Sequence, residues 1–113
     1  MSNSTAEIKD WHAHVYFDAE TRDAAAEVYQ QVEAALKGIE LGRFHERPVG
    51  PHPMWSFQVA FGPELLDTVF PWLVLNRQGL DVFMHPNTGN AFEDHTDRVS
   101  FIGKSYELDT SKL

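Results

Sequence analysis

The six histidines of this 113-residue chain are its main candidates for chemistry, because the chain has no cysteine to act as nucleophile or metal ligand. His12 and His14 alternate with apolar residues over 11–17, a pattern typical of a β-strand, so both imidazoles point to one face. His85 ends a second alternating segment, 80–85. Neutral imidazole is the commonest metal ligand in proteins. If these strands are antiparallel neighbours, the three histidines meet at one end of the sheet, and we expect them to hold a metal ion.

The predicted metal centre would leave coordination positions open for other molecules. Three histidines, or two histidines and a carboxylate from Glu93 or Asp94, suit Fe(II) or Zn(II). His95 follows these carboxylates within 87–97, which we interpret as a loop, and it could fold back over the same end of the sheet. A carboxylate there could instead orient an imidazole through a hydrogen bond.

His52 lies in a proline-rich turn, 48–53, where closely spaced prolines exclude regular structure. By topology this turn is at the far end of the first strand, near Tyr16 and His45. We therefore expect His52 to lie away from His12 within one subunit. It could reach the metal centre from a partner subunit. It could also reach the centre within one subunit if the open face is shorter than this topology implies.

Hydrophobic periodicity predicts the elements that must position these residues. One helix runs from Thr21, a candidate N-cap, to Lys37, and a second follows Gly62, with Pro71 expected to kink or divide it before Arg77. The order β-α-β-β-α-β plus an extra C-terminal strand predicts an α+β, ferredoxin-like sandwich. Its antiparallel sheet would have the spatial order four, one, three, two, with both helices on one face. The predicted strands are 11–17, 39–47, 54–61 and 80–85, with a short fifth at 98–102.

The composition indicates a single soluble domain, 11–113, after a flexible N-terminal tail, 1–10. The formal net charge of −8 argues against nucleic acid and anionic membranes as partners, since both require basic residues. The N-terminus lacks the apolar segment of a signal peptide, and no apolar run is long enough to cross a bilayer. We therefore expect a cytoplasmic protein. A sheet with one bare face also favours a homodimer.

Each of these features has a simpler interpretation. A single histidine on a strand is more often a surface residue than a ligand, and only the third histidine at an adjacent point favours a metal. His45 and Arg47 are expected to be solvated, although Arg47 could bind a substrate carboxylate. Tyr16 and Phe83 could stack on an aromatic ligand or fill a dimer interface. A dimeric module that binds a ligand without catalysis is therefore an alternative.

Five segments in order along the chain resemble the DOPA 4,5-dioxygenase family. The likeness covers nearly the whole chain, from Trp11 to the C-terminus, and it implies a ferredoxin-like homodimer. It also implies a non-haem iron enzyme that cleaves a catechol ring beside its hydroxyl groups with O2. The segments are 11–17, 50–55, 73–77, 85–89 and 94–96. The histidines that match the family are His12, His14, His52, His85 and His95.

The implied reaction assigns further roles to residues of this chain. Extradiol cleavage requires Fe(II) and open coordination positions for a small aromatic substrate and O2. Zn(II) could occupy the same site in place of Fe(II). The cleavage also requires a base and an acid, for which His52 and His95 are the first candidates. Tyr16, Gln58 and Arg47 are candidate contacts for the rest of the substrate. A zinc or manganese enzyme of hydrolase or isomerase type at the same site is the second interpretation.

Overall fold

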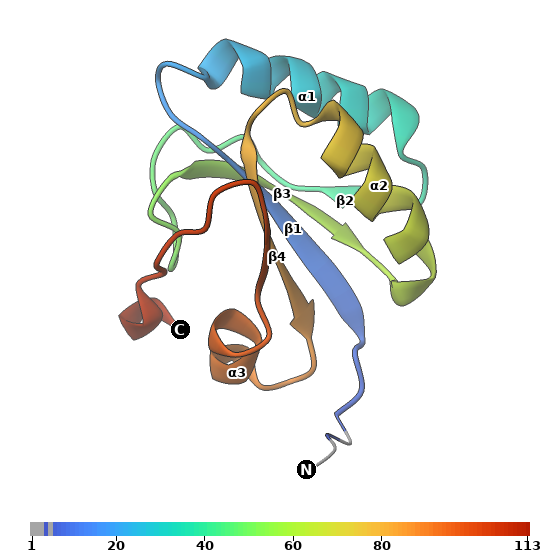
Figure 1. Cartoon of the computed structure of the whole chain (residues 1–113), viewed down its shortest axis with the longest axis vertical. Helices are drawn as coiled ribbons and strands as arrows, with labels where there is room; N and C mark the ends of the chain where they lie inside the picture. The colour runs from blue at the N-terminus through green and yellow to red at the C-terminus, as the bar shows by residue number, and fades with distance from the viewer. Residues whose placement is uncertain (1–3, 5) are drawn as a thin grey trace.

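The fold is a five-stranded antiparallel sheet with two long helices on one face, α1 and α2 (Figure 1). The computed structural model describes Ser4 and residues 6–113, and no helix in this part of the chain is long and apolar enough to cross a membrane. The strands are β1 (Asp10–Phe17), β2 (Glu40–Leu41), β3 (Trp55–Phe61), β4 (Asp81–Asn87) and β5 (Ser100–Ile102). The helices are α1 (Arg22–Ala35), α2 (Leu66–Asn76) and α3 (Ala91–Thr96), with 3-10 turns η1 (Pro63–Leu65) and η2 (Thr110–Lys112).

The strand order, β2-β3-β1-β4-β5, confirms the predicted ferredoxin-like arrangement. It places β1 between β3 and β4, with the short β5 at the outer edge of β4. Alternation along β1 sends Ala13, Val15 and Phe17 beneath the helices, and all three are buried. Burial of this apolar face against α1 and α2 is the main stabilising contribution to the fold. The remaining core residues are Ala25, Val28, Val32, Leu36, Phe57, Val59, Phe61, Val69, Leu73, Leu80, Val82, Met84 and Ile102.

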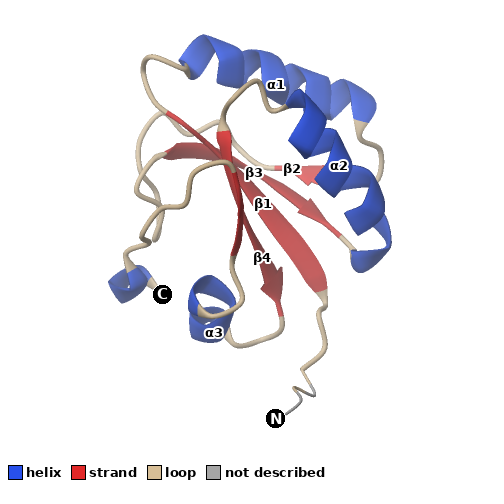
Figure 2. Ribbon diagram, in the orientation of Figure 1, coloured by secondary structure: helices blue, strands red, loops and turns tan. Residues whose placement is uncertain are grey.

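The opposite face of the sheet is partly covered, whereas the sequence predicted a bare face. Figure 2 shows α3 and the C-terminal segment on the side of the sheet away from α1 and α2. Tyr16 and Phe83, which alternate with core residues and point to this side, are 2% and 0% exposed. These two rings are therefore buried within the chain, and the polar face narrows to a site around the histidines.

The second strand is much shorter than predicted. Only Glu40–Leu41 pairs with β3 as a strand, and His45 adds an isolated bridge to Ser56. Between them, Phe44 turns its ring into the core, where its centroid lies 4.5 Å from that of Phe17. This inward turn breaks the alternation that a longer strand would need.

Two prolines interrupt the structure less than the sequence suggested. α2 continues through Pro71, whose ring lies on the exposed side of the helix, so the helix is not divided there. β4 continues through Pro86 to Asn87. β5 pairs only with Val82, Phe83 and Met84, so Pro86 lies where β4 has β1 as its one neighbour. An edge position of this kind tolerates a residue without an N–H group.

The segment 87–97 contains a helix, α3, where the sequence predicted a loop. Asn90 is its N-cap, and the Asn90 side chain accepts a hydrogen bond of 3.1 Å from the Glu93 backbone N–H. Asn followed three residues later by Glu is a recognised start signal for a helix. The segment has no apolar periodicity, because it is only six residues long, and the periodicity that identifies longer helices could not detect it.

Candidate metal centre

The candidate metal centre lies where β1 and β4 run side by side, on the face away from α1 and α2. The antiparallel register pairs His12 with His85, and directly paired residues point to the same face of a sheet. His14 lies one step further along β1 on that face, beside Phe83. Each of the three histidines presents a ring nitrogen within 4.8 Å of the others. The fold therefore brings together the three side chains that the sequence proposed as metal ligands.

The three imidazoles fit a divalent transition metal. His14 Nε2 and His85 Nε2 lie 3.1 Å apart. Two ligand atoms that are each about 2.1 Å from one ion and form a right angle at that ion would be about 3 Å apart. His14 and His85 are buried and His12 is half-buried, so few waters compete for the ion. Imidazole suits Fe(II) and Zn(II) alike. Since all three donors are imidazoles, the geometry favours the three-histidine set over one with a carboxylate.

A hydrogen bond to the backbone prepares His85 for metal binding. His85 Nδ1 lies 3.0 Å from the carbonyl oxygen of Pro86. A carbonyl oxygen only accepts, so Nδ1 carries the proton and the lone pair of the neutral ring is on Nε2, the nitrogen that faces His14. Hydrogen bonds of this kind orient ligating imidazoles in metalloproteins.

His95 lies over the centre from α3, as the sequence predicted. Its ring centroid is 4.1 Å from that of His85. His95 Nδ1 donates a hydrogen bond of 2.7 Å to the backbone oxygen of Ala91, one turn earlier in α3. The lone pair of neutral His95 is therefore on Nε2, where it could accept a proton.

The acidic neighbours of His95 do not join the centre. Asp94 is buried and accepts hydrogen bonds from Thr88 N at 2.8 Å and Thr88 Oγ1 at 2.9 Å. Arg98 completes the group with an ion pair of 3.1 Å to Asp94. Burial alone raises the pKa of Asp94, but the hydrogen bonds from Thr88 and Arg98 outweigh it and hold that pKa below its ordinary value. The carboxylate thus ties α3 to the end of β4, which places His95.

Within a single chain His52 lies beside His14, so the predicted alternative of a shorter open face is the correct one, and His52 needs no partner subunit to reach the centre. Its ring centroid is 4.1 Å from that of His14. Its Nδ1 lies 2.8 Å from the hydroxyl of Tyr16, as the predicted position near Tyr16 required. His14 therefore has His52 on one side and His85 on the other, and five histidines share one cluster.

The sequence could not place His52 because the turn does not continue the line of β3. The Pro48–Pro53 turn curls back over the polar face, held by a hydrogen bond of 3.1 Å from His52 N to Val49 O. The C-terminal segment also contacts it, since Asp109 N donates to Pro51 O at 2.9 Å. Contacts between segments more than fifty residues apart leave no signal in local periodicity.

The three predicted substrate contacts lie in different surroundings. Gln58 is half-buried on β3, directly paired with His14, so it borders the centre. Arg47 is exposed in the loop before the proline-rich turn. The hydroxyl of Tyr16 bonds to His52 inside the cluster. Contact between any of these side chains and a substrate stays a prediction.

Burial lowers the pKa of the imidazoles at the centre. Desolvation is the largest cause, and neighbouring imidazoles lower the pKa values further, to about 4 for His52 and about 4 for His85. The pKa of His14 falls well below its ordinary value for the same reasons. Burial also lowers the pKa of His12, although the carboxylate of Asp10 opposes this shift. These rings are neutral at pH 7, and their lone pairs are available to a metal.

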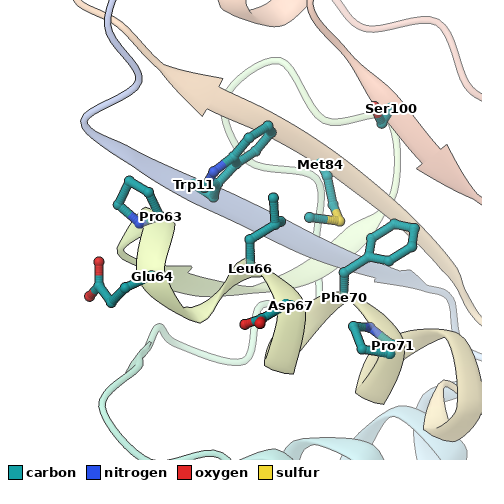
Figure 3. Close-up of a pocket in the computed structure, with 9 residues that line it drawn as sticks. All are labelled: Trp11, Pro63, Glu64, Leu66, Asp67, Phe70, Pro71, Met84 and Ser100. Carbon is teal, nitrogen blue, oxygen red and sulfur yellow. The ribbon is translucent and has the colours of Figure 1, made fainter.

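A wide hollow of about 800 Å³ lies on the other side of the sheet (Figure 3). Trp11 of β1 and Met84 of β4 contribute to it from the sheet, and Leu66 and Phe70 contribute from α2. Trp11 precedes His12 in the chain, but successive strand residues point to opposite faces. None of the residues that line the hollow is a histidine. The hollow is therefore separate from the metal centre.

The fold and the site define a class of protein: a ferredoxin-like domain with clustered histidines on the sheet face away from its two long helices. Residues 11–112 match the Dopa 4,5-dioxygenase family, and the chain belongs to this family. The DOPA 4,5-dioxygenase of Amanita muscaria is 34% identical over 116 residues, which cover 96% of this chain and 51% of that protein. An uncharacterised 21.2 kDa protein of Botryotinia fuckeliana is 34% identical over 109 residues, covering 87% of this chain and 60% of that protein.

A solved structure from Nostoc punctiforme has the same fold. It superposes with a TM-score of 0.92 at 46% sequence identity, over 99% of this chain and 96% of that one. The Nostoc protein carries a provisional assignment as a dioxygenase. By contrast, this chain spans only about half the length of the Amanita relative.

The metal-free protein should lose stability as the pH falls from about 6.5 towards about 4. The pKa of His85 is about 4 in the folded chain, against an ordinary value of 6.5, and the same holds for His52. Between these values the unfolded chain binds more protons than the folded chain, so acid favours unfolding. The stability that the neutral imidazoles contribute to the folded chain is fully present above pH 6.5. Urea unfolding of chelator-treated protein between pH 7.5 and pH 5 (about one unit per step) would measure it.

Two variants test whether the cluster causes this pH dependence. His85→Gln removes one buried imidazole and should flatten the dependence of the unfolding free energy on pH. His45→Gln changes a half-buried histidine outside the cluster and should leave the pH dependence of the unfolding free energy as in the natural chain. An unfolding free energy that does not change over this pH range would contradict the burial of neutral histidines.

Proposed function

We propose that this protein is a non-haem iron dioxygenase that opens the ring of a small catechol by extradiol cleavage with O2. The observation that carries the proposal is the group of three imidazoles, buried His14 and His85 with half-buried His12, flanked by His52 and His95. Membership of the Dopa 4,5-dioxygenase family supports the same activity. The name of the Amanita muscaria relative favours a DOPA-like catechol as the substrate class.

The three-histidine group would hold Fe(II) and leave room for other ligands. Bound Fe(II) would supply the Lewis-acid and redox chemistry that lets a catechol react with O2. The chain contributes a dry, neutral setting, because His14 and His85 are buried and their pKa values are lowered. Gln58, beside His14, would contact the substrate at the rim of this site.

His95 would transfer the proton of the reaction, and His52 would assist with a hydrogen bond. His95 Nδ1 is occupied by the Ala91 carbonyl, so its Nε2 lone pair can take a proton from a catechol hydroxyl. Burial raises the pKa of Tyr16 above its ordinary value, so its hydroxyl stays protonated and can donate to His52 Nδ1. In that tautomer the proton of neutral His52 is on Nε2, from which it can donate a hydrogen bond to a bound reactant.

This pair of roles matches the proton balance of the reaction. Extradiol cleavage adds both atoms of O2 to the catechol and breaks the ring bond beside one hydroxyl-bearing carbon. No proton is gained or lost overall, so the proton that a base removes from the catechol must be balanced by one that an acid returns. His95 can take this proton as the base and, once protonated, return it as the acid, while the N–H group of His52 donates a hydrogen bond to the reacting oxygens.

Loss of one ligating imidazole should abolish tight metal binding. For protein prepared without a histidine tag, titration calorimetry with Fe(II) under argon, or with Zn(II), should show one site per chain. We expect His14→Gln and His85→Gln to weaken binding by roughly 100-fold or more, since even outer-shell changes cost 10- to 100-fold. His45→Gln is the matched control. Unchanged affinity in both ligand variants would reject the three-histidine site and favour a binding module without a metal.

Ring cleavage can be observed directly in the iron-loaded protein. Anaerobic loading with Fe(II), followed by L-DOPA or caffeate and then air, should give a yellow semialdehyde product. An oxygen electrode should record one O2 consumed per catechol. Protein loaded with Zn(II) is the control and should give no yellow product, because Zn(II) has no redox chemistry. Hydrolase or isomerase activity of the zinc form, without oxygen uptake by the iron form, would support the second interpretation instead.

We also propose that the protein is a homodimer, with α2 at the contact. Phe70, Val74 and Leu75 are 42%, 43% and 81% exposed on this one helix. Phe70 also lines the hollow formed with Trp11 and Met84 (Figure 3). A large exposed apolar patch favours a protein contact, and twofold pairing of identical patches closes the assembly.

A charge placed on α2 should separate the proposed dimer. Sedimentation equilibrium of the natural chain should give twice the monomer mass, and Leu75→Glu should give the monomer mass. Leu113→Glu makes the same change at an exposed residue far from α2 in sequence and should leave the dimer intact. A natural chain that sediments as a monomer at about 100 μM would reject the dimer, since specific dimers bind more tightly than this.

A further inference from the structure

The C-terminal segment, residues 103–113, crosses the polar face of the sheet and is anchored to β4. Figure 1 shows it leaving the sheet and ending on the same side as α3. Asp81, the first residue of β4, accepts two hydrogen bonds from this segment. One comes from the backbone N–H of Lys104 at 2.8 Å and the other from the hydroxyl of Tyr106 at 2.6 Å. Asp81 thus fixes both the path of the segment and the position of the Tyr106 ring.

Tyr106 reaches the histidine cluster through Tyr16. The two tyrosine rings meet edge to face, with centroids 5.3 Å apart. The Tyr16 ring is buried, and its hydroxyl lies 2.8 Å from His52 Nδ1. A chain of contacts therefore runs from Asp81 through Tyr106 and Tyr16 to one ring nitrogen of His52. Because Tyr16 is packed on this side by Tyr106, its hydroxyl is held in line with His52.

The same segment also holds the backbone beside His52. The N–H of Asp109 donates a hydrogen bond of 2.9 Å to the carbonyl of Pro51. The Asp109 side chain accepts from the N–H of Ser111 at 3.1 Å and so caps η2, which follows it. The hydrogen bond from Asp109 N–H to Pro51 O ties the proline-rich turn to the end of the chain. His52 is therefore held twice, at its ring through Tyr16 and at its backbone through Pro51.

The turn that carries His52 has little regular structure of its own. Between β2 and β3 the segment joins the sheet at Gly42, whose N–H donates to Gln58 O at 2.8 Å, and at the His45–Ser56 bridge, and both points precede the turn. Gly50, two residues before His52, has φ of +54°, a backbone conformation that residues with side chains rarely adopt. A turn of this kind needs outside contacts to place one imidazole accurately. The C-terminal segment supplies one directly, at Pro51, and supports a second through Tyr16.

We propose that the C-terminal segment is a clamp that positions His52 beside the metal centre, with Tyr106 and Asp109 as its positioning residues. The inference rests on the proposed function for the role of His52 as hydrogen-bond donor, but the clamp itself is a structural claim. Neither residue needs to touch the substrate. Each would act on the reaction by keeping His52 Nε2 at a fixed place beside His14.

Two single substitutions loosen the two arms of the clamp separately. Tyr106→Phe keeps the ring against Tyr16 and removes the hydroxyl that bonds to Asp81. Asp109→Pro removes the N–H that bonds to Pro51, and the φ of −83° at Asp109 is close to the value that proline adopts. Ser105→Ala changes an exposed residue of the same segment and is the matched control.

The first measurement does not depend on activity. Proton–nitrogen NMR of the metal-free full chain reports the tautomer of each imidazole, with the His52 signal assigned from a His52→Gln variant. Tyr106→Phe and Asp109→Pro should shift the His52 signal and leave the signals of His85 and His95 in place. Ser105→Ala should shift none of them. An unchanged His52 signal in both clamp variants would overturn the clamp.

The second measurement uses the iron-loaded protein. Both clamp variants should lower kcat by about 10-fold, because a misplaced hydrogen-bond donor slows the reaction without weakening substrate binding. KM and Fe(II) affinity should stay within about twofold of the natural chain, since the clamp touches no ligand. A fall in Fe(II) affinity equal to the fall in kcat would overturn a positioning role. If the natural chain shows no oxygen uptake but the His52 signal shifts as expected, the clamp stands and the proposed function fails.

Discussion

The antiparallel register of β1 and β4 is the constraint on which the site depends. It pairs His12 with His85, and the two-residue period of a strand then places His14 on the same face. A shift of this register by one residue would turn the imidazoles of one strand beneath the helices and bring Ala13 or Met84 to the polar face. The apolar residues between the histidines prevent that shift, because they fill the core under α1 and α2. The same alternation thus stabilises the fold and gathers the three candidate ligands.

Burial gives these histidines a chemical character that exposed ones lack. Removal from water disfavours the charged form of His12, His14, His52 and His85. Their lowered pKa values leave lone pairs available at neutral pH, at some expense of stability in acid. A bound divalent ion would compensate for the close approach of His14 and His85, whose Nε2 atoms face each other at 3.1 Å. Such an arrangement fits a candidate metal site.

The segments above the sheet differ from the sheet in how they hold their histidines. His12, His14 and His85 are placed by strand pairing, which determines position over several residues at once. His95 is placed by a short helix that is secured by the Asn90 cap and by the bonds of the buried Asp94 to Thr88 and Arg98. His52 is placed by a turn that depends on Tyr16 and on the C-terminal segment. The three candidate ligands therefore rest on the most cooperative part of the fold, and the two flanking histidines rest on its periphery.

The sequence by itself determined the sheet, its strand order and the three-histidine group, because alternating residues and strand topology are local patterns that decide which side chains share a face. It also indicated that His95 returns to the same end of the sheet. Only the tertiary structure decided that His52 joins the cluster, that α3 is a helix, and that Tyr106 and Asp81 belong to the surroundings of the site. Those features depend on contacts between distant segments, such as Asp109 with Pro51 and Tyr106 with Asp81, and no periodicity records them. Strand pairing can be inferred from spacing along the chain, whereas the path of a turn or a terminal segment depends on what the rest of the fold leaves for it to contact.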